Sequence, residues 1–61
     1  MKLQDLRKEL GWSMEQLHLE ADVSVDTIRR IERGEVTPRP SIVRRLAKAL
    51  GVNPKDIEVV K

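Results

Sequence analysis

The chain has 61 residues, no cysteine, one histidine and a net charge of +2, and 36% of its residues are charged. A chain this short buries only about 60% of its extended surface, so we expect one small domain stabilised by closely matched helix faces. The absence of cysteine excludes disulfides and thiolate zinc sites, and a single histidine cannot form a metal site.

The first predicted helix runs from Leu3 to Leu10, with Leu3, Leu6 and Leu10 on one side and Gly11 as its stop. This segment is amphipathic and lacks the continuous apolar run of a signal peptide, so we do not interpret it as one. No apolar run in the chain approaches the ~20 residues of a membrane span. We therefore expect a soluble protein without a membrane partner and, if the chain is natural, a cytoplasmic one associated with the nucleoid.

A second helix is predicted to begin after Ser13. The Ser13 hydroxyl can accept a hydrogen bond from the first turn while the Gln16 side chain reaches back, which together form a capping box. Trp12 before the cap and Leu17 after it form a hydrophobic staple, so we interpret Trp12 as a packing residue rather than a base-stacking one.

The same start pattern recurs at Val23 and Ser24, with Ile28 in the staple position, and predicts a third helix. The residues between the two helices, 21–23, leave room only for a sharp turn. Two short helices at a steep angle across such a turn form the helix-turn-helix unit that reads DNA, here over about residues 14–33.

The outer face of the third helix follows from the rotation of about 100° between successive helical residues. With Val25 as the reference, Ile28 and Ile31 point inward. The residues on the opposite side are charged, and most are arginine: Asp26, Arg29, Arg30 and Arg33. Arginine donates the forked hydrogen bonds that guanine and phosphate accept. A solvated charged face is the alternative, but the turn before the helix favours a DNA-facing one.

Residues 35–40 form the one predicted loop, and a fourth helix follows it. The apolar residues of this helix share one face: Ile42, Val43, Leu46, Ala47 and Leu50. At its start, Arg39 and the backbone amides of Ser41 and Ile42 form a candidate phosphate site, with a free loop charge as the equal alternative for Arg39.

A short last helix is predicted at Pro54, with Asn53 as its cap and Val52 stapled to Ile57. No internal repeat, linker or low-complexity segment interrupts the chain. The glycines are isolated helix stops, so no phosphate-cradling loop is present, and the scattered carboxylates suggest no catalytic cluster. We expect no enzymatic activity, no cofactor, no metal and no small-molecule substrate.

Charge is distributed unevenly along the sequence. Residues 1–28 contain three basic and six acidic side chains, a balance of −3, whereas residues 29–61 contain nine basic and four acidic ones, a balance of +5. The basic half begins at the outward face of the third helix. Such asymmetry is expected when one side of a protein meets phosphates.

Several short segments together resemble a known family: Leu6-Arg7 with Gly11, residues 31–34, Pro38, and residues 46–52. From about Leu3 to Ile57 the chain resembles the Cro/Xre-type helix-turn-helix domain of phage and bacterial repressors. The resemblance implies an all-α, compact, five-helix, lambda-repressor-like domain over residues 1–61, whose third helix enters the major groove. It also implies that Arg7 pairs with Glu32, which would join the first helix to the end of the third.

Three positions depart from the family pattern. Met14 stands where a DNA-contacting Gln is usual, His18 where Ala is usual, and Asp22 where Gly is usual. Asp tolerates a left-handed backbone better than most residues, so Asp22 is a mild change. His18 is bulkier than Ala and needs room or an outward tilt, and it lacks the partners that a metal or acid–base site requires.

We therefore predict a transcriptional-regulator type of protein that binds specific sequences of double-stranded DNA through the major groove. The side chains expected to meet base edges are Met14, Val25, Asp26, Arg29 and Arg30. The groups expected to meet phosphates are Ser13, Arg33, Arg39 and the amides of Ser41 and Ile42.

Two alternatives stay open from the sequence. The first is a protein-interaction module on the same fold, such as an antitoxin-like or adaptor domain with weak or no DNA binding, which Met14 and the acidic first half favour. The second concerns origin: the altered contact positions, and a chain that starts and stops at the domain edges, would also suit an engineered or designed binder. The oligomeric state is open between a monomer and a homodimer on DNA.

Overall fold

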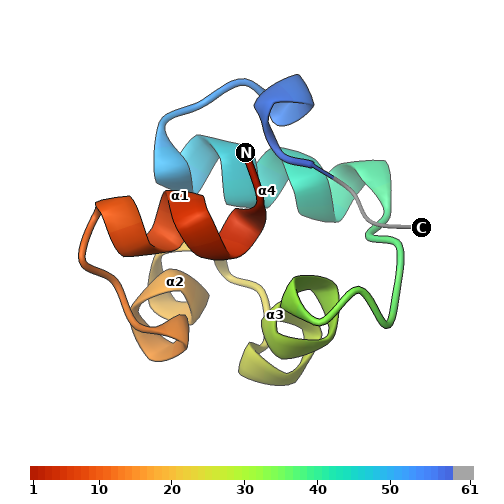
Figure 1. Ribbon diagram of the computed structural model, residues 1–61, viewed down its shortest axis with the longest axis horizontal. Coiled ribbons are helices and arrows are strands. Elements are labelled where there is room, and N and C mark those ends of the chain that lie inside the picture. The colour runs from red at the N-terminus through yellow and green to blue at the C-terminus, as the bar shows by residue number, and fades with distance from the viewer. Residues whose placement is uncertain (59–61) are drawn as a thin grey trace.

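The computed structural model describes residues 1–58, which leaves the last three residues of the predicted domain outside the description. Within the described residues the chain is helical: α1 (Leu3–Glu9), α2 (Met14–Ala21), α3 (Val25–Glu32), α4 (Pro40–Leu50) and a single 3-10 turn, η1 (Pro54–Asp56). In Figure 1, α1 and α4 cross the upper half of the molecule, and α2 and α3 lie side by side below them. The predicted all-α class is confirmed.

The starts of α2 and α3 follow the predicted serine caps. Ser13 Oγ accepts from the Gln16 amide at 3.1 Å, and Ser24 Oγ accepts from the Thr27 amide at 3.1 Å. The reciprocal half of the box at Ser13 is absent, because the Gln16 side chain donates to Glu20 Oε2 at 3.1 Å instead. A hydrogen bond to a carboxylate one turn along the helix is stronger than one between neutral groups.

The end of α1 departs from the prediction at one residue. Gly11 adopts the left-handed conformation (φ +72°) that stops the helix, as expected. However, α1 ends at Glu9, so Leu10 lies past the last turn that packs on the core and is 47% exposed. Leu3 and Leu6 are buried. The expectation that Leu10 shares their apolar side was therefore wrong.

The predicted fifth helix is only the 3-10 turn η1, so a count of five α-helices does not hold for the described residues. The turn cannot extend because Ile57 is extended and buried in the core. The Glu58 amide then donates to the Met1 carbonyl at 2.8 Å, and the Met1 ammonium donates to the Asp56 carbonyl at 2.8 Å. The two described residues after η1, Ile57 and Glu58, are thus attached to the N-terminus, beside which the chain leaves η1 in Figure 1.

Fully buried side chains from three helices meet in the hydrophobic core. Leu17 of α2, Ile28 of α3 and Leu46 of α4 are its largest fully buried members. Trp12 is half-buried and packs against this core, in keeping with a packing role. Since Ile28 and Ile31 fix the inner side of α3, the charged side of that helix must face outward.

Candidate nucleic-acid interface

The turn between α2 and α3 is held by a left-handed residue and a side-chain hydrogen bond. Asp22 has φ 56° and ψ 43°, a conformation that Asp adopts more readily than most residues. The half-buried His18 ring lies with Nδ1 2.9 Å from the Val23 carbonyl, so Nδ1 is the protonated nitrogen that donates. His18 therefore fills its unusual position by bracing the turn, a role that its residue type alone did not suggest.

All four predicted outward residues of α3 are exposed. The exposed fractions of the side chains are 59% for Asp26, 45% for Arg29, 56% for Arg30 and 67% for Arg33. Ile28 on the opposite side is fully buried. The helix and its C-cap residue Arg33, which lies 3.6 Å from Glu35, thus present three guanidinium groups to solvent, with the Asp26 carboxylate among them.

That carboxylate pairs with two of the arginines. Asp26 Oδ1 lies 3.4 Å from Arg29 Nη1, and Asp26 Oδ2 lies 3.0 Å from Arg30 Nε. The sequence places these residues on one face of the helix, but their pairing was not predicted. Their spacing of three and four residues along one helix was the signal that would have indicated it.

The two apolar residues proposed for base contact differ in their surroundings. Val25 opens α3 and is half-buried. Met14 opens α2, is also half-buried, and packs partly against the core. Part of the Met14 side chain is therefore committed to packing, and Val25 is the better candidate for an apolar contact with a base.

Apart from Arg33 at the end of α3, the groups proposed to contact phosphates lie at helix starts. Ser13 caps α2, and its hydroxyl, which accepts from Gln16, still has a hydrogen to donate. Arg39 is exposed at the N-cap of α4, where no side-chain cap is present. The Ile42 amide already donates to the Arg39 carbonyl at 2.9 Å, which leaves the Ser41 amide as the better donor of the two.

An open hollow of about 390 Å³ connects α3 to the start of α4. Its lining combines two arginines and one aspartate with apolar and hydroxyl side chains from α3, the intervening loop and α4: Asp26, Thr27, Arg30, Val36, Thr37, Pro38, Arg39 and Ile42. Arg30 and Arg39, which come from different elements, thus share one concave surface. Sequence reasoning did not find the loop residues in this lining, because loop backbone carries no periodic pattern.

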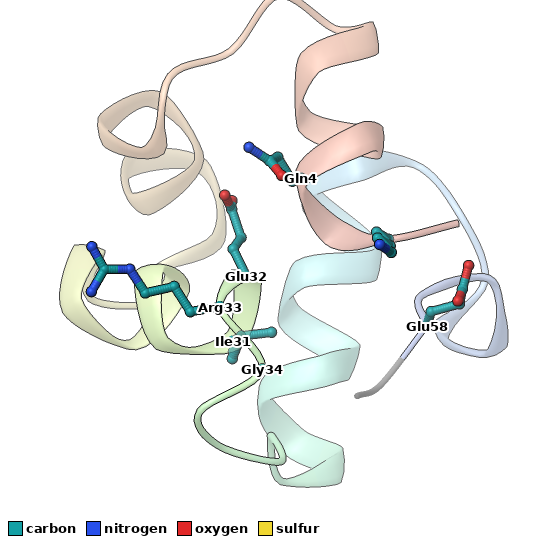
Figure 2. Close-up of a pocket in the computed structure, with 7 residues that line it drawn as sticks. Gln4, Ile31, Glu32, Arg33, Gly34 and Glu58 are labelled. Carbon is teal, nitrogen blue, oxygen red and sulfur yellow. The ribbon is translucent and has the colours of Figure 1, made fainter. Parts of the chain in front are cut away.

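Glu32 points in a different direction from the outward arginines. Arg7 Nε and Nη2 donate to the two Glu32 carboxylate oxygens at 2.8 and 3.0 Å, and Arg7 Nη1 donates to the Trp12 carbonyl at 2.7 Å. The hydrogen bond to Glu32 raises the pKa of Arg7, so the guanidinium stays charged. Figure 2 shows Glu32 directed from α3 toward α1 while Arg33 points away, beside a hollow of about 220 Å³ that Gln4 and Glu58 also line.

The comparison with protein families identifies this arrangement. The model of the helix-turn-helix family HTH_3, the Cro/C1 type, matches residues 3–57. The chain belongs to this helix-turn-helix family. The resemblance noted from the sequence is confirmed, and membership indicates a DNA-binding domain of the regulator type. Searches of the curated proteins and of the solved structures found no match.

Two further properties hold for the residues that the structure describes. None of its helices is both long and apolar enough to cross a bilayer. Among residues 1–58, no three His, Asp or Glu side chains gather in a way that would hold a metal ion.

Proposed function

We propose that this domain binds specific sequences of double-stranded DNA, with α3 in the major groove. The observation that carries the proposal is the arginine face of α3, exposed opposite a buried apolar face and preceded by the short, fixed turn at Asp22. A helix held in this way can enter a groove about 12 Å wide with its side chains against base edges.

Arg29 and Arg30 are the proposed guanine readers, because guanine O6 and N7 accept the paired donors of a guanidinium. Val25, at the start of the same helix, offers an apolar surface that suits a thymine methyl. Met14 is the second proposed apolar contact. Asp26 lies among these side chains, and its carboxylate could accept from cytosine N4.

Phosphate contacts would fix the register of the helix on the duplex without reading sequence. Arg33, the C-cap residue of α3, has a side chain 67% exposed, and Arg39 lines the same hollow as Arg30. Ser13 and the Ser41 amide add uncharged donors at the starts of α2 and α4, where the helix dipole favours an anion. The Ile42 amide is a weaker member of this set because it is already bonded.

The proposal is tested by following the backbone amide resonances of the labelled protein during titration with a short duplex. We expect the largest shift changes at residues 25–33, at the start of α2 and at residues 39–41. The amides around Lys48, on the exposed side of α4, serve as the internal control and should move little.

Two outcomes would contradict the proposal. If no amide shifts at millimolar duplex in low salt, the domain does not bind DNA, and the protein-interaction alternative is favoured. If the shifts centre on α1 and α4 and spare α3, the domain binds DNA by another face.

A further inference from the structure

Asp26 is an exposed acidic side chain of α3, and it contacts both arginines of this helix at once. Each carboxylate oxygen faces a different guanidinium, Oδ1 at 3.4 Å from Arg29 and Oδ2 at 3.0 Å from Arg30. As the second residue of α3, Asp26 also lies where the helix dipole stabilises a negative charge. The Asp26 carboxylate therefore lies between two guanidinium groups at the start of the helix.

The closer contact leaves Arg30 in a form suited to guanine. It is made by Nε, the inner nitrogen of the guanidinium. The outer nitrogens, Nη1 and Nη2, are then available as the pair of donors that guanine O6 and N7 accept. An exposed arginine otherwise samples many rotamers, and holding its inner nitrogen reduces the entropy that binding would remove.

We infer that Asp26 is a positioning residue, which sets the guanine preference of this domain through Arg30 rather than by reading a base itself. This inference rests on the proposed function. The carboxylate oxygens that would accept from cytosine N4 already face Arg29 and Arg30, so a base contact would have to displace or share an arginine.

The same carboxylate opposes binding to DNA of the wrong sequence. Non-specific binding depends almost wholly on phosphate neutralisation, and a negative charge on the binding face weakens it. A free Arg30 could also turn toward a phosphate, since Arg39 lines the same hollow and would attract the same anion. Asp26 therefore raises specificity in two ways: it aims Arg30 at a base and it disfavours non-target duplexes.

The test compares the unaltered protein with Asp26→Asn, which removes the charge at nearly constant size, and with Asp26→Glu, which keeps it. Asp5→Asn is the matched control, because Asp5 is an exposed first-turn aspartate on α1 and the substitution changes net charge equally. Fluorescence anisotropy measures each protein against its preferred duplex, a duplex with the guanine replaced, and a scrambled duplex, over a range of salt.

Asp26→Asn should raise affinity for the scrambled duplex by roughly threefold to tenfold and steepen the salt dependence by about 0.9 in log–log slope, as one added phosphate contact would. Its preference for the guanine duplex should fall by at least about fivefold, which is the low end of what one forked contact discriminates. Asp26→Glu should recover most of the preference, because a glutamate still pairs four residues along a helix. Asp5→Asn should leave the preference unchanged.

Three results would overturn the inference. If Asp26→Asn loses affinity only for duplexes with one particular cytosine, Asp26 reads that base directly. If Asp26→Asn leaves both the guanine preference and the scrambled-duplex affinity unchanged, the ion pairs have no role in recognition, and the proposed function still stands. If the unaltered protein prefers no duplex, the proposed function fails, and this inference fails with it before any variant is measured.

Discussion

Arg7 and Glu32 form a two-pronged ion pair that joins α1 to the last turn of α3, across 25 residues of sequence. Their side chains are only 9% and 4% exposed. The third nitrogen of the Arg7 guanidinium, Nη1, donates to the Trp12 carbonyl, just before α2 begins. The buried Arg7 guanidinium therefore connects α1, α3 and the residues that lead into α2. The relative placement of these three helices sets the direction in which the exposed arginines of α3 project.

The first prediction follows from this burial. Glu32→Ala should lower the free energy of unfolding by about 3–5 kcal/mol, because it leaves the Arg7 charge buried without its partner. Urea unfolding followed by circular dichroism measures the loss.

The matched control is Glu35→Ala: Glu35 has a side chain 52% exposed and only a 3.6 Å contact with Arg33. It should change stability by about 0.5 kcal/mol or less. A Glu32→Ala loss as small as that of the control would show that the pair does not hold the helices together.

The second prediction concerns the arginine face. Arg29→Ala or Arg30→Ala should weaken binding to the preferred duplex by about 1–3 kcal/mol and relax the base preference at one position. Because both side chains are exposed, neither change should unfold the domain. Arg44→Ala, an exposed arginine of α4, is the control and should alter affinity little. If both α3 variants bind as tightly as the parent, α3 is not the recognition helix.

The third prediction separates phosphate contact from base reading. Arg39 lies at the start of α4 and lines the same hollow as Arg30. Arg39→Ala should weaken all duplexes by the same factor and reduce the slope of log affinity against log salt by about 0.9, because one phosphate contact is lost. Binding isotherms at four or five salt concentrations give that slope. An unchanged slope would mean that Arg39 is a free loop charge.

The fourth prediction concerns the thymine methyl. Replacing each thymine of the preferred duplex by uracil removes only that methyl group, so at least one replacement should weaken binding. Val25→Ala should blunt the effect, since Val25 is the apolar residue at the start of α3. Met14→Ala should blunt it less, because part of Met14 packs against the core. If no uracil replacement matters, both are packing residues.

Much of the fold could be predicted from sequence because its signals are local. The caps at Ser13 and Ser24 and the stop at Gly11 each act within three residues, so a single chain displays them fully. The prediction failed where a local helix signal competes with a contact between residues far apart in the sequence. The last helix is a single turn because Ile57 is drawn into the core and Glu58 bonds to Met1, and no periodicity shows a pairing between the chain's two ends.

Part of the candidate site could also be predicted, because the signal for that part is local. Helical rotation alone assigns Arg29, Arg30 and Arg33 to one exposed side. It does not give the hollow that Arg30 shares with Arg39, which depends on the path of the loop between α3 and α4. The hydrogen bond from His18 to the Val23 carbonyl was missed because it depends on the bend of the turn, which spacing does not reveal.

The central claim, that α3 reads specific base sequences, is tested most directly by selecting bound duplexes from a random library and sequencing them. We expect enrichment of a short motif that contains guanine, and loss of the preference at that guanine when Arg30→Ala is selected in parallel. A selected pool no different from the starting library would mean that α3 reads no base sequence, and it would favour a protein-interaction role for this domain.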